Sequence, residues 1–182
     1  MKQCQRWWVC LPAVFIFTIF FLLSEWDLDH DAHATDPKMS SQLIEPCELI
    51  PRTEAEEILG EEMKDGLYSE NKVVGQKICF YEAADENSFA FLQVSLTQNS
   101  FISANVLASG QNAQTIFNSI KEAFPDRQDI EGMGDDAFIA TPGIHILKGD
   151  YYLTIGVGNI NRNKDKLTDA GAKAMANLEV AL

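Results

Sequence analysis

Positive charge is scarce in this chain. Its 182 residues include 14 Lys and Arg against 27 Asp and Glu, which gives a formal net charge of −13. A surface with this balance repels the phosphates of nucleic acids and the headgroups of anionic membranes. We therefore expect no nucleic acid among its partners, and the simplest role of the excess negative charge is to keep the protein soluble.

Catalytic and metal-binding motifs are also missing. Beyond residue 34 the only histidine is His145, and no Ser or Cys stands at the sharp strand-to-helix turn of a nucleophile elbow. That histidine and two cysteines are too few ligands for a zinc site if the cysteines pair. Gly156-Val-Gly158 lacks the further glycine of a dinucleotide-binding loop. We expect no catalytic residue, no metal site and no cofactor.

The stretch from Asp126 to Asp136 is rich in carboxylates, as a calcium-binding loop would be. An EF-hand loop places oxygen ligands at alternate positions and glycine at the sixth. Counted from the first aspartate, the third and fifth positions hold Gln128 and Ile130, and Gly132 comes seventh. The pattern therefore predicts a solvated loop that leads into a strand, rather than a calcium site.

The N-terminus has the charge pattern of an export signal. Lys2 and Arg6 precede an uncharged apolar run over residues 7–23, and acidic residues follow the run. Ala32-His33-Ala34 has the form of a signal-peptidase site, which predicts cleavage after Ala34. The run of 17 residues is longer than most signal cores, so an uncleaved anchor in the inner membrane is the alternative.

These features divide the chain into three parts. Residues 1–34 are the predicted signal peptide or N-terminal membrane anchor, and residues 35–45 are a polar linker. Residues 46–182 form a single domain that is large enough to fold alone. We expect this domain to be extracytoplasmic, either periplasmic or secreted, and the alternative is that residues 7–23 hold it at the inner membrane.

The cysteines of the predicted domain agree with export. Two of the four cysteines lie in the N-terminal segment, and the domain keeps one pair, Cys47 and Cys79. In an oxidising compartment two such cysteines are expected to form a disulfide. Two buried free thiols are the alternative interpretation. A disulfide would fasten the segment before the first helix to the first well-marked strand.

The best-marked element is a hairpin of residues 144–148 and 151–157, joined by Gly149-Asp150. Glycine at the first central position of a two-residue loop suits a primed turn, whose twist matches that of the strands. This turn pairs Lys148 with Tyr151 and Ile146 with Leu153. Cross-strand partners share a face, so one face of the hairpin is apolar and requires a covering helix. That face consists of Ile144, Ile146, Leu153, Ile155 and Val157.

The remaining pattern predicts a mostly antiparallel α+β fold, with about five to six strands and helices packed on the sheet. Apolar spacing and capping residues predict helices over residues 53–60, 113–124 and 167–182, with Thr53 and Thr168 as N-caps. Alternation predicts strands over residues 77–83, 89–96 and 137–140. Residues 101–107 fit a strand after a Gln98-Asn99 turn or the start of a helix, and we favour the strand.

The order of several short motifs resembles that of a known family. The motifs are Pro46-Cys47-Glu-Leu-Ile50, Cys79-Phe-Tyr81, Gly132-Met-Gly134-Asp-Asp-Ala-Phe138 and Lys148-Gly-Asp150. They are similar to those of a broad bacterial family of exported small proteins and lipoproteins, a domain of unknown function whose fold is like that of the photosystem II extrinsic protein PsbP. The resemblance covers residues 45–182 and implies a PsbP-like α/β sandwich with a binding or assembly role. The lipid-attachment Cys of the lipoprotein members is absent.

The second face of the hairpin offers a candidate binding surface. His145 shares this face with Tyr152 and Thr154, opposite the apolar residues. Nearby glycines leave room for a ligand or partner, although a polar residue on a half-exposed sheet face is the commoner case.

We expect an exported, non-catalytic binding or accessory module of the cell envelope, whose partner is an envelope protein or a small ligand. The alternative is a hydrolase that uses His145 as a base together with Glu131, Asp135 and Asp136 of the acidic loop. A deep pocket that joins His145 to these carboxylates would favour the enzyme.

Overall fold

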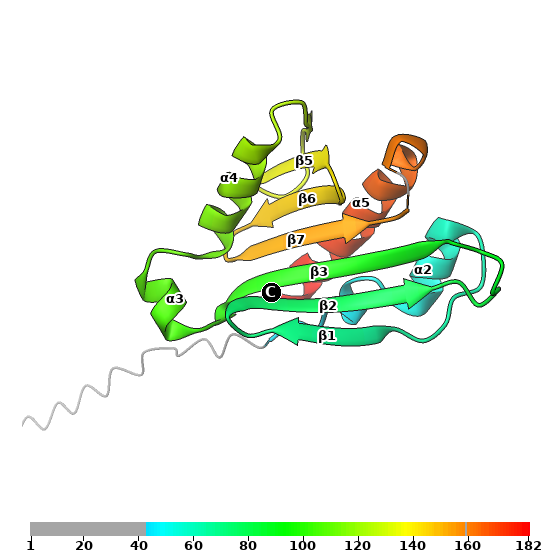
Figure 1. Ribbon diagram of the computed structural model, residues 1–182, viewed down its shortest axis with the longest axis horizontal. Coiled ribbons are helices and arrows are strands. Elements are labelled where there is room, and N and C mark those ends of the chain that lie inside the picture. Colours follow the sequence, from blue (N-terminus) through cyan, green and yellow to red (C-terminus); the bar gives the residue numbers. More distant parts are fainter. Residues whose placement is uncertain (1–42, 159) are drawn as a thin grey trace, which may run out of the picture. The chain divides into compact units, whose positions relative to one another are not determined.

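A computed structural model describes residues 43–158 and 160–182, which belong to one compact unit (Figure 1). The predicted signal or anchor lies outside the described residues. Seven antiparallel strands form one sheet in the order β1-β2-β3-β7-β6-β5-β4. The strands are β1 (Leu67–Asn71), β2 (Val74–Glu82), β3 (Phe91–Ile102), β4 (Gln128–Ile130), β5 (Asp136–Ala140), β6 (Gly143–Lys148) and β7 (Tyr151–Gly156). The predicted α+β class is confirmed, with seven strands rather than five or six.

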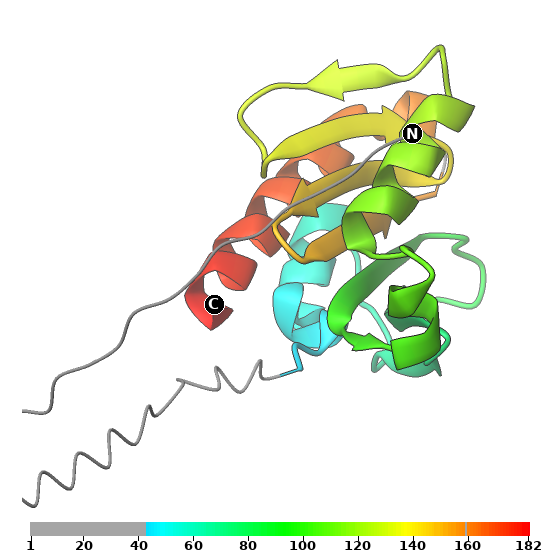
Figure 2. The same cartoon turned by 90° about the vertical axis from the view of Figure 1, so that its left-hand side faces the viewer.

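Helices lie on both faces of the sheet. The helical elements are α1 (Pro46–Leu49), α2 (Arg52–Leu59), α3 (Ala104–Ala108), α4 (Ala113–Ala123), the 3-10 turn η1 (Ile160–Arg162) and α5 (Lys164–Ala181). Figure 2 shows α5, in red, and the cyan segment of α1 and α2 on one side of the strands, with α4, in green, on the other. We call the side under α1, α2 and α5 the first face and the side under α4 the second face.

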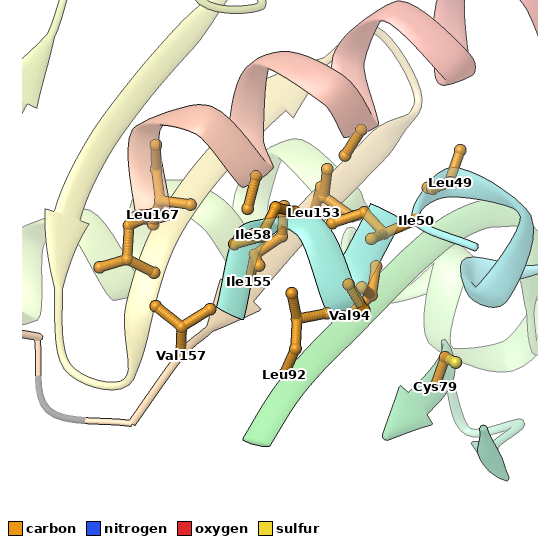
Figure 3. Packing of buried hydrophobic residues seen from close by; sticks show 14 of the residues in the cluster. Leu49, Ile50, Ile58, Cys79, Leu92, Val94, Leu153, Ile155, Val157 and Leu167 are labelled. Carbon is orange, nitrogen blue, oxygen red and sulfur yellow. The ribbon is translucent and has the colours of Figure 1, made fainter. Parts of the chain in front are cut away.

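The central hairpin has the predicted register. Lys148 pairs with Tyr151, Ile146 with Leu153, and Ile144 with Ile155. The predicted apolar face is buried on the first face of the sheet, where side chains from α2, α5 and the strands meet in one layer (Figure 3). The covering helix that this face required is α5, with α1 and α2 beside it.

A glycine lets α5 approach the sheet closely. A Cβ atom at Gly171 would lie 2.8 Å from Met133 Sδ and 3.1 Å from Ile144 Cδ1. A larger residue there would overpack the core. The helix begins at Lys164 and not at Thr168, whose hydroxyl donates to the Lys164 carbonyl from inside the helix at 3.0 Å. The predicted Thr168 cap is therefore wrong.

Residues 44–50, which precede α2, are held on the first face by a disulfide and by hydrogen bonds. A disulfide joins Cys47 of α1 to Cys79 of β2, as predicted, with Cα atoms 5.2 Å apart. Tyr81 Oη donates to the Ile50 carbonyl at 2.8 Å. The buried Gln98 amide accepts from the backbone N–H of Ile44 and donates to its carbonyl, at 2.9 and 2.8 Å. A disulfide is characteristic of an oxidising compartment outside the cytoplasm.

Two sequence predictions on β3 need correction. Gln98 and Asn99 form no turn, because β3 continues through them to Ile102 and Gln98 pairs with Tyr151 of β7. The Gln98 side chain is fully buried and hydrogen-bonded to Ile44, whereas a turn residue would be exposed. Residues 101–107 therefore divide between the end of the strand and the short helix α3, so the strand that we favoured accounts for only their first two residues.

The start of α2 also differs from the prediction. The helix begins at Arg52 with Pro51 at the N-cap and no side-chain cap, so Thr53 forms no capping box. The Glu56 carboxylate instead accepts from the backbone N–H of Met63 at 3.2 Å. The predicted stop at Gly60 is confirmed, since this residue adopts φ 81° and its N–H donates to the Glu56 carbonyl.

Candidate functional site

The helix α4 covers part of the second face. It lies beside β6 and β7 (Figure 1), and its buried Phe117 packs on Phe138 of β5 and Tyr152 of β7, with ring centroids 5.2 and 5.6 Å away. These residues form a small apolar cluster separate from the main core. The strands β2 and β3 lie on the other side of β7 in the sheet, and residues of β2, β3, β6, β7 and α4 line one hollow.

Local hydrogen bonds fix where α4 begins. Asn112 and Thr115 form a capping box, in which each side chain accepts from the other residue's backbone N–H, at 2.9 and 2.8 Å. Asn99 of β3 accepts from the first helical N–H, that of Ala113, at 2.7 Å. Its amide also donates to Asp150 in the hairpin turn at 2.7 Å. The start of α4 is thus tied to β3 and to the central hairpin.

The hollow is a cleft of about 530 Å³ between α4 and the strands. Its floor comes from β2, β3, β6 and β7. Its walls come from α4, the loop before α4 and the turn between β5 and β6. All of its lining side chains are uncharged at neutral pH. They are Val74, Gln76, Gln93, Ser95, Thr97, Gln111, Ile116, Ile120, Phe124, Thr141, Pro142, His145, Tyr152 and Thr154. We call this the neutral cleft.

The three residues of the predicted binding face all line the neutral cleft. Thr154 pairs with Ser95 on one side and with His145 on the other, so these three form one row across β3, β7 and β6. Tyr152 pairs with Thr97 in the next row. The sequence therefore indicated the residues from the central hairpin, and the structure adds those from β3.

His145 is the most enclosed polar group of the cleft. The side chain is 2% exposed, and its ring stacks on Phe138 at 4.6 Å. Nδ1 lies 2.7 Å from Tyr152 Oη, whereas Nε2 has no hydrogen-bond partner within residues 43–158 and 160–182. Burial lowers the pKa of His145 to about 4, against a weaker opposing effect of the Ala140 and Thr141 carbonyls. The imidazole is therefore neutral at physiological pH.

Tyr152 is also uncharged under these conditions. Burial raises the pKa of its phenol, and the Thr154 hydroxyl opposes that shift only in part. A neutral imidazole and a protonated phenol share one hydrogen bond, so the pair adds no charge to the cleft. The neutrality of the site therefore follows from the protonation states of its residues as well as from its composition.

The acidic loop does not reach the cleft. Asp135 accepts from the backbone N–H of Gly149 at 2.6 Å and so supports the hairpin turn. Asp136 accepts from Lys121 Nζ at 2.7 Å, which ties β5 to α4. Glu131 is exposed, and none of the three lines the cleft. The carboxylates of the hydrolase alternative are thus not assembled around His145.

No hydrogen bond within residues 43–158 and 160–182 joins the His145 ring to a Ser, Thr or Cys side chain, as a nucleophile and its base would require. Ser95 and His145 belong to strands separated by β7, so their backbones lie roughly 9–10 Å apart. His145 Nδ1 is occupied by Tyr152 rather than by an aliphatic hydroxyl. No cluster of three or more His, Cys, Asp or Glu suited to a metal ion occurs among these residues. The polar side chains of the cleft are hydroxyl, amide, phenol and imidazole groups.

Sequence reasoning missed the residues that β3 and α4 contribute. The alternation over residues 89–96 already separates Gln93 and Ser95 from the buried Leu92 and Val94. It does not show that β3 lies next to β7, because that pairing joins segments about 60 residues apart. The long-range pairing, and not the local pattern, creates the polar floor.

Comparisons with protein-family models, curated proteins and solved structures found no match for this chain. The resemblance to an exported bacterial family therefore stays a prediction. Across the stretch that the structure describes, no helix has the length and apolar character needed to cross a membrane. The predicted apolar run over residues 7–23 lies outside that stretch.

Proposed function

We propose that this protein is an exported, non-catalytic binding or accessory module of the bacterial cell envelope, and that it binds a small ligand in the neutral cleft. One observation carries the proposal, namely the cleft of about 530 Å³ that contains all three residues of the predicted binding face. Cavities of roughly 300–1,000 Å³ with an apolar wall and a few placed polar groups are typical small-molecule sites.

The chemistry of the lining supports a binding role without catalysis. The hydroxyls of Ser95, Thr97 and Thr154 lie in the middle of strands, where no sharp turn presents them to a carbonyl or phosphoryl group. The cleft contains no carboxylate that could act with His145 as a general acid or base. The PsbP-like resemblance, which implies binding or assembly, agrees with this proposal.

Export is supported by the disulfide and by the N-terminal pattern. The Cys47–Cys79 bond fits an oxidising compartment. The basic, apolar and acidic segments of the first 34 residues fit a signal peptide or an anchor. The strongly negative chain also fits a protein that remains soluble outside the cytoplasm.

Blocking the cleft tests this function. Thr154→Trp places a large ring on the half-buried floor, and Ser100→Trp adds the same ring at an exposed position of β3 outside the cleft. We expect small molecules extracted from the cell envelope to raise the melting temperature of the wild type and of Ser100→Trp, because ligands that bind the folded state stabilise it. The same extract should leave the melting temperature of Thr154→Trp unchanged.

Circular dichroism would verify that both variants fold. The proposal fails if the extract raises the melting temperature of none of the three proteins. It also fails if the extract raises that of Thr154→Trp as much as that of the wild type, because the cleft is then not the binding site.

A further inference from the structure

The two walls of the neutral cleft differ in chemistry. Ile116, Ile120 and Phe124 follow one another at intervals of four residues along α4 and its end, and they form an apolar wall. The strands opposite present uncharged polar groups. These are Gln76, Gln93, Ser95, Thr97, Tyr152 and Thr154. A ligand that fills the cleft meets hydrocarbon on one side and hydrogen-bonding groups on the other.

Two lysines on elements that line the cleft form ion pairs outside it. Lys121 of α4 forms ion pairs with Asp136 and Asp129. Lys77 of β2 forms an ion pair with Glu45. Neither lysine lines the cleft, and the neutral His145 adds no positive charge. A charged ligand would therefore lose its hydration without gaining a counter-charge, which strongly disfavours its binding.

The polar groups of the floor favour ligands that both donate and accept hydrogen bonds. A glutamine side chain carries one acceptor oxygen and two donor hydrogens, and a hydroxyl can act in either sense. Gln76, Gln93 and Gln111 lie along the cleft with the hydroxyls of β3 and β7. Amides and alcohols have the same dual character without any charge, so they can both donate to and accept from these groups.

We infer that the ligand is an uncharged small molecule with amide or hydroxyl groups along one edge and an apolar surface along the other. The apolar surface packs on α4 and the polar edge faces β3 and β7. This inference rests on the proposed binding role of the cleft and adds the chemical class of the ligand.

A charge-matched fragment screen tests this class. The exported, disulfide-bonded protein, labelled with ¹⁵N, is mixed with sets of fragments in which an amide, its carboxylate analogue and its amine analogue share one apolar skeleton. Backbone amides of Ser95 and Thr154 and the side-chain amide of Gln93 report on the cleft. We expect neutral fragments to shift these signals, and each charged analogue to bind at least about tenfold more weakly.

A pair of glutamine variants sharpens the test. Gln93→Glu places a carboxylate in the cleft, whereas Gln114→Glu places one on the exposed side of α4. We expect Gln93→Glu to bind the neutral fragments more weakly than the wild type does. It should bind their amine analogues about tenfold more tightly than the wild type does. Gln114→Glu should bind like the wild type.

The outcomes separate the two proposals. Charged analogues that bind the wild-type cleft as tightly as the neutral fragments overturn the ligand class and leave the binding role intact. A screen in which no fragment of any charge shifts the cleft signals overturns the binding role itself.

Discussion

His145 is enclosed by rings from three parts of the chain. Phe138 stacks on it from β5, Tyr152 binds its Nδ1 from β7, and Phe124 at the end of α4 lies 6.5 Å away between ring centroids. The hairpin pattern predicted the first neighbours on its own face, Tyr152 and Thr154. It did not predict how deeply His145 is buried, because the covering helix, Ala113–Ala123, comes from an earlier segment of the chain that the hairpin pattern does not include.

The burial of His145 predicts a pH dependence of stability. Its pKa is about 4 in the folded protein and close to 6.5 when exposed, so the unfolded chain binds the proton more readily in this interval. The stabilisation is therefore complete above pH 6.5 and is lost as the pH falls toward 4. We expect this group alone to lower the free energy of unfolding by about 2 kcal/mol between pH 7 and pH 5.

Urea unfolding of the wild type and of His145→Gln at both pH values measures this contribution. The variant lacks the titrating group, and it should lose about 2 kcal/mol less than the wild type over the same interval. The same loss of stability in both proteins would show that His145 is accessible to protons in the folded state.

The helix α4 contributes to two environments at once. Ala113 and Phe117 are buried in the cluster on the second face, whereas Ile116, Ile120 and Phe124 are half-buried and line the cleft. The spacing of these residues predicted the helix and its apolar face correctly. It did not distinguish the two environments, because both sets lie within one broad apolar stripe.

The capping box of α4 provides a test at this scale. Asn112→Ala removes the side chain that accepts from Thr115 N–H, and we expect it to lower the free energy of unfolding by about 1 kcal/mol. Asn118→Ala, at an exposed position inside the same helix, should change stability by no more than about 0.5 kcal/mol. Urea unfolding compares the two variants, and equal effects would mean that the cap does not hold α4.

The strands differ in how well they could be predicted. The β6–β7 hairpin was predicted with its register, because one of its faces is buried and its turn contains Gly149. The edge strand β1 is exposed along its whole length, so no alternation marks it. The other edge strand, β4, has only three residues, too few to show any alternation.

At the scale of the whole molecule, the strong negative charge of the chain does not extend to the lining of the neutral cleft. The chain carries a net charge of −13, yet the lining of the neutral cleft has no charged side chain. Two acidic residues have structural roles outside the cleft, Asp135 at the hairpin turn and Asp136 beside Lys121. The composition led us to expect no nucleic acid among the partners, but it gave no indication of a neutral site, since composition averages over the surface.

The disulfide connects the fold to the proposed location. It joins α1 to β2 across the first face, and together with Tyr81 and Gln98 it fastens residues 44–50 to the sheet. The sequence predicted this pair because only two cysteines remain beyond the N-terminal segment. The disulfide is thus one of several contacts that hold this segment on the first face.

Native mass spectrometry of the protein from its own cells, after alkylation of free thiols, tests the central claim that an oxidised, exported module carries a ligand in the neutral cleft. We predict that Cys47 and Cys79 are not alkylated, and that the wild type, but not Thr154→Trp, carries the added mass of an uncharged small molecule. A wild-type chain that is alkylated at both cysteines and binds nothing would contradict the account.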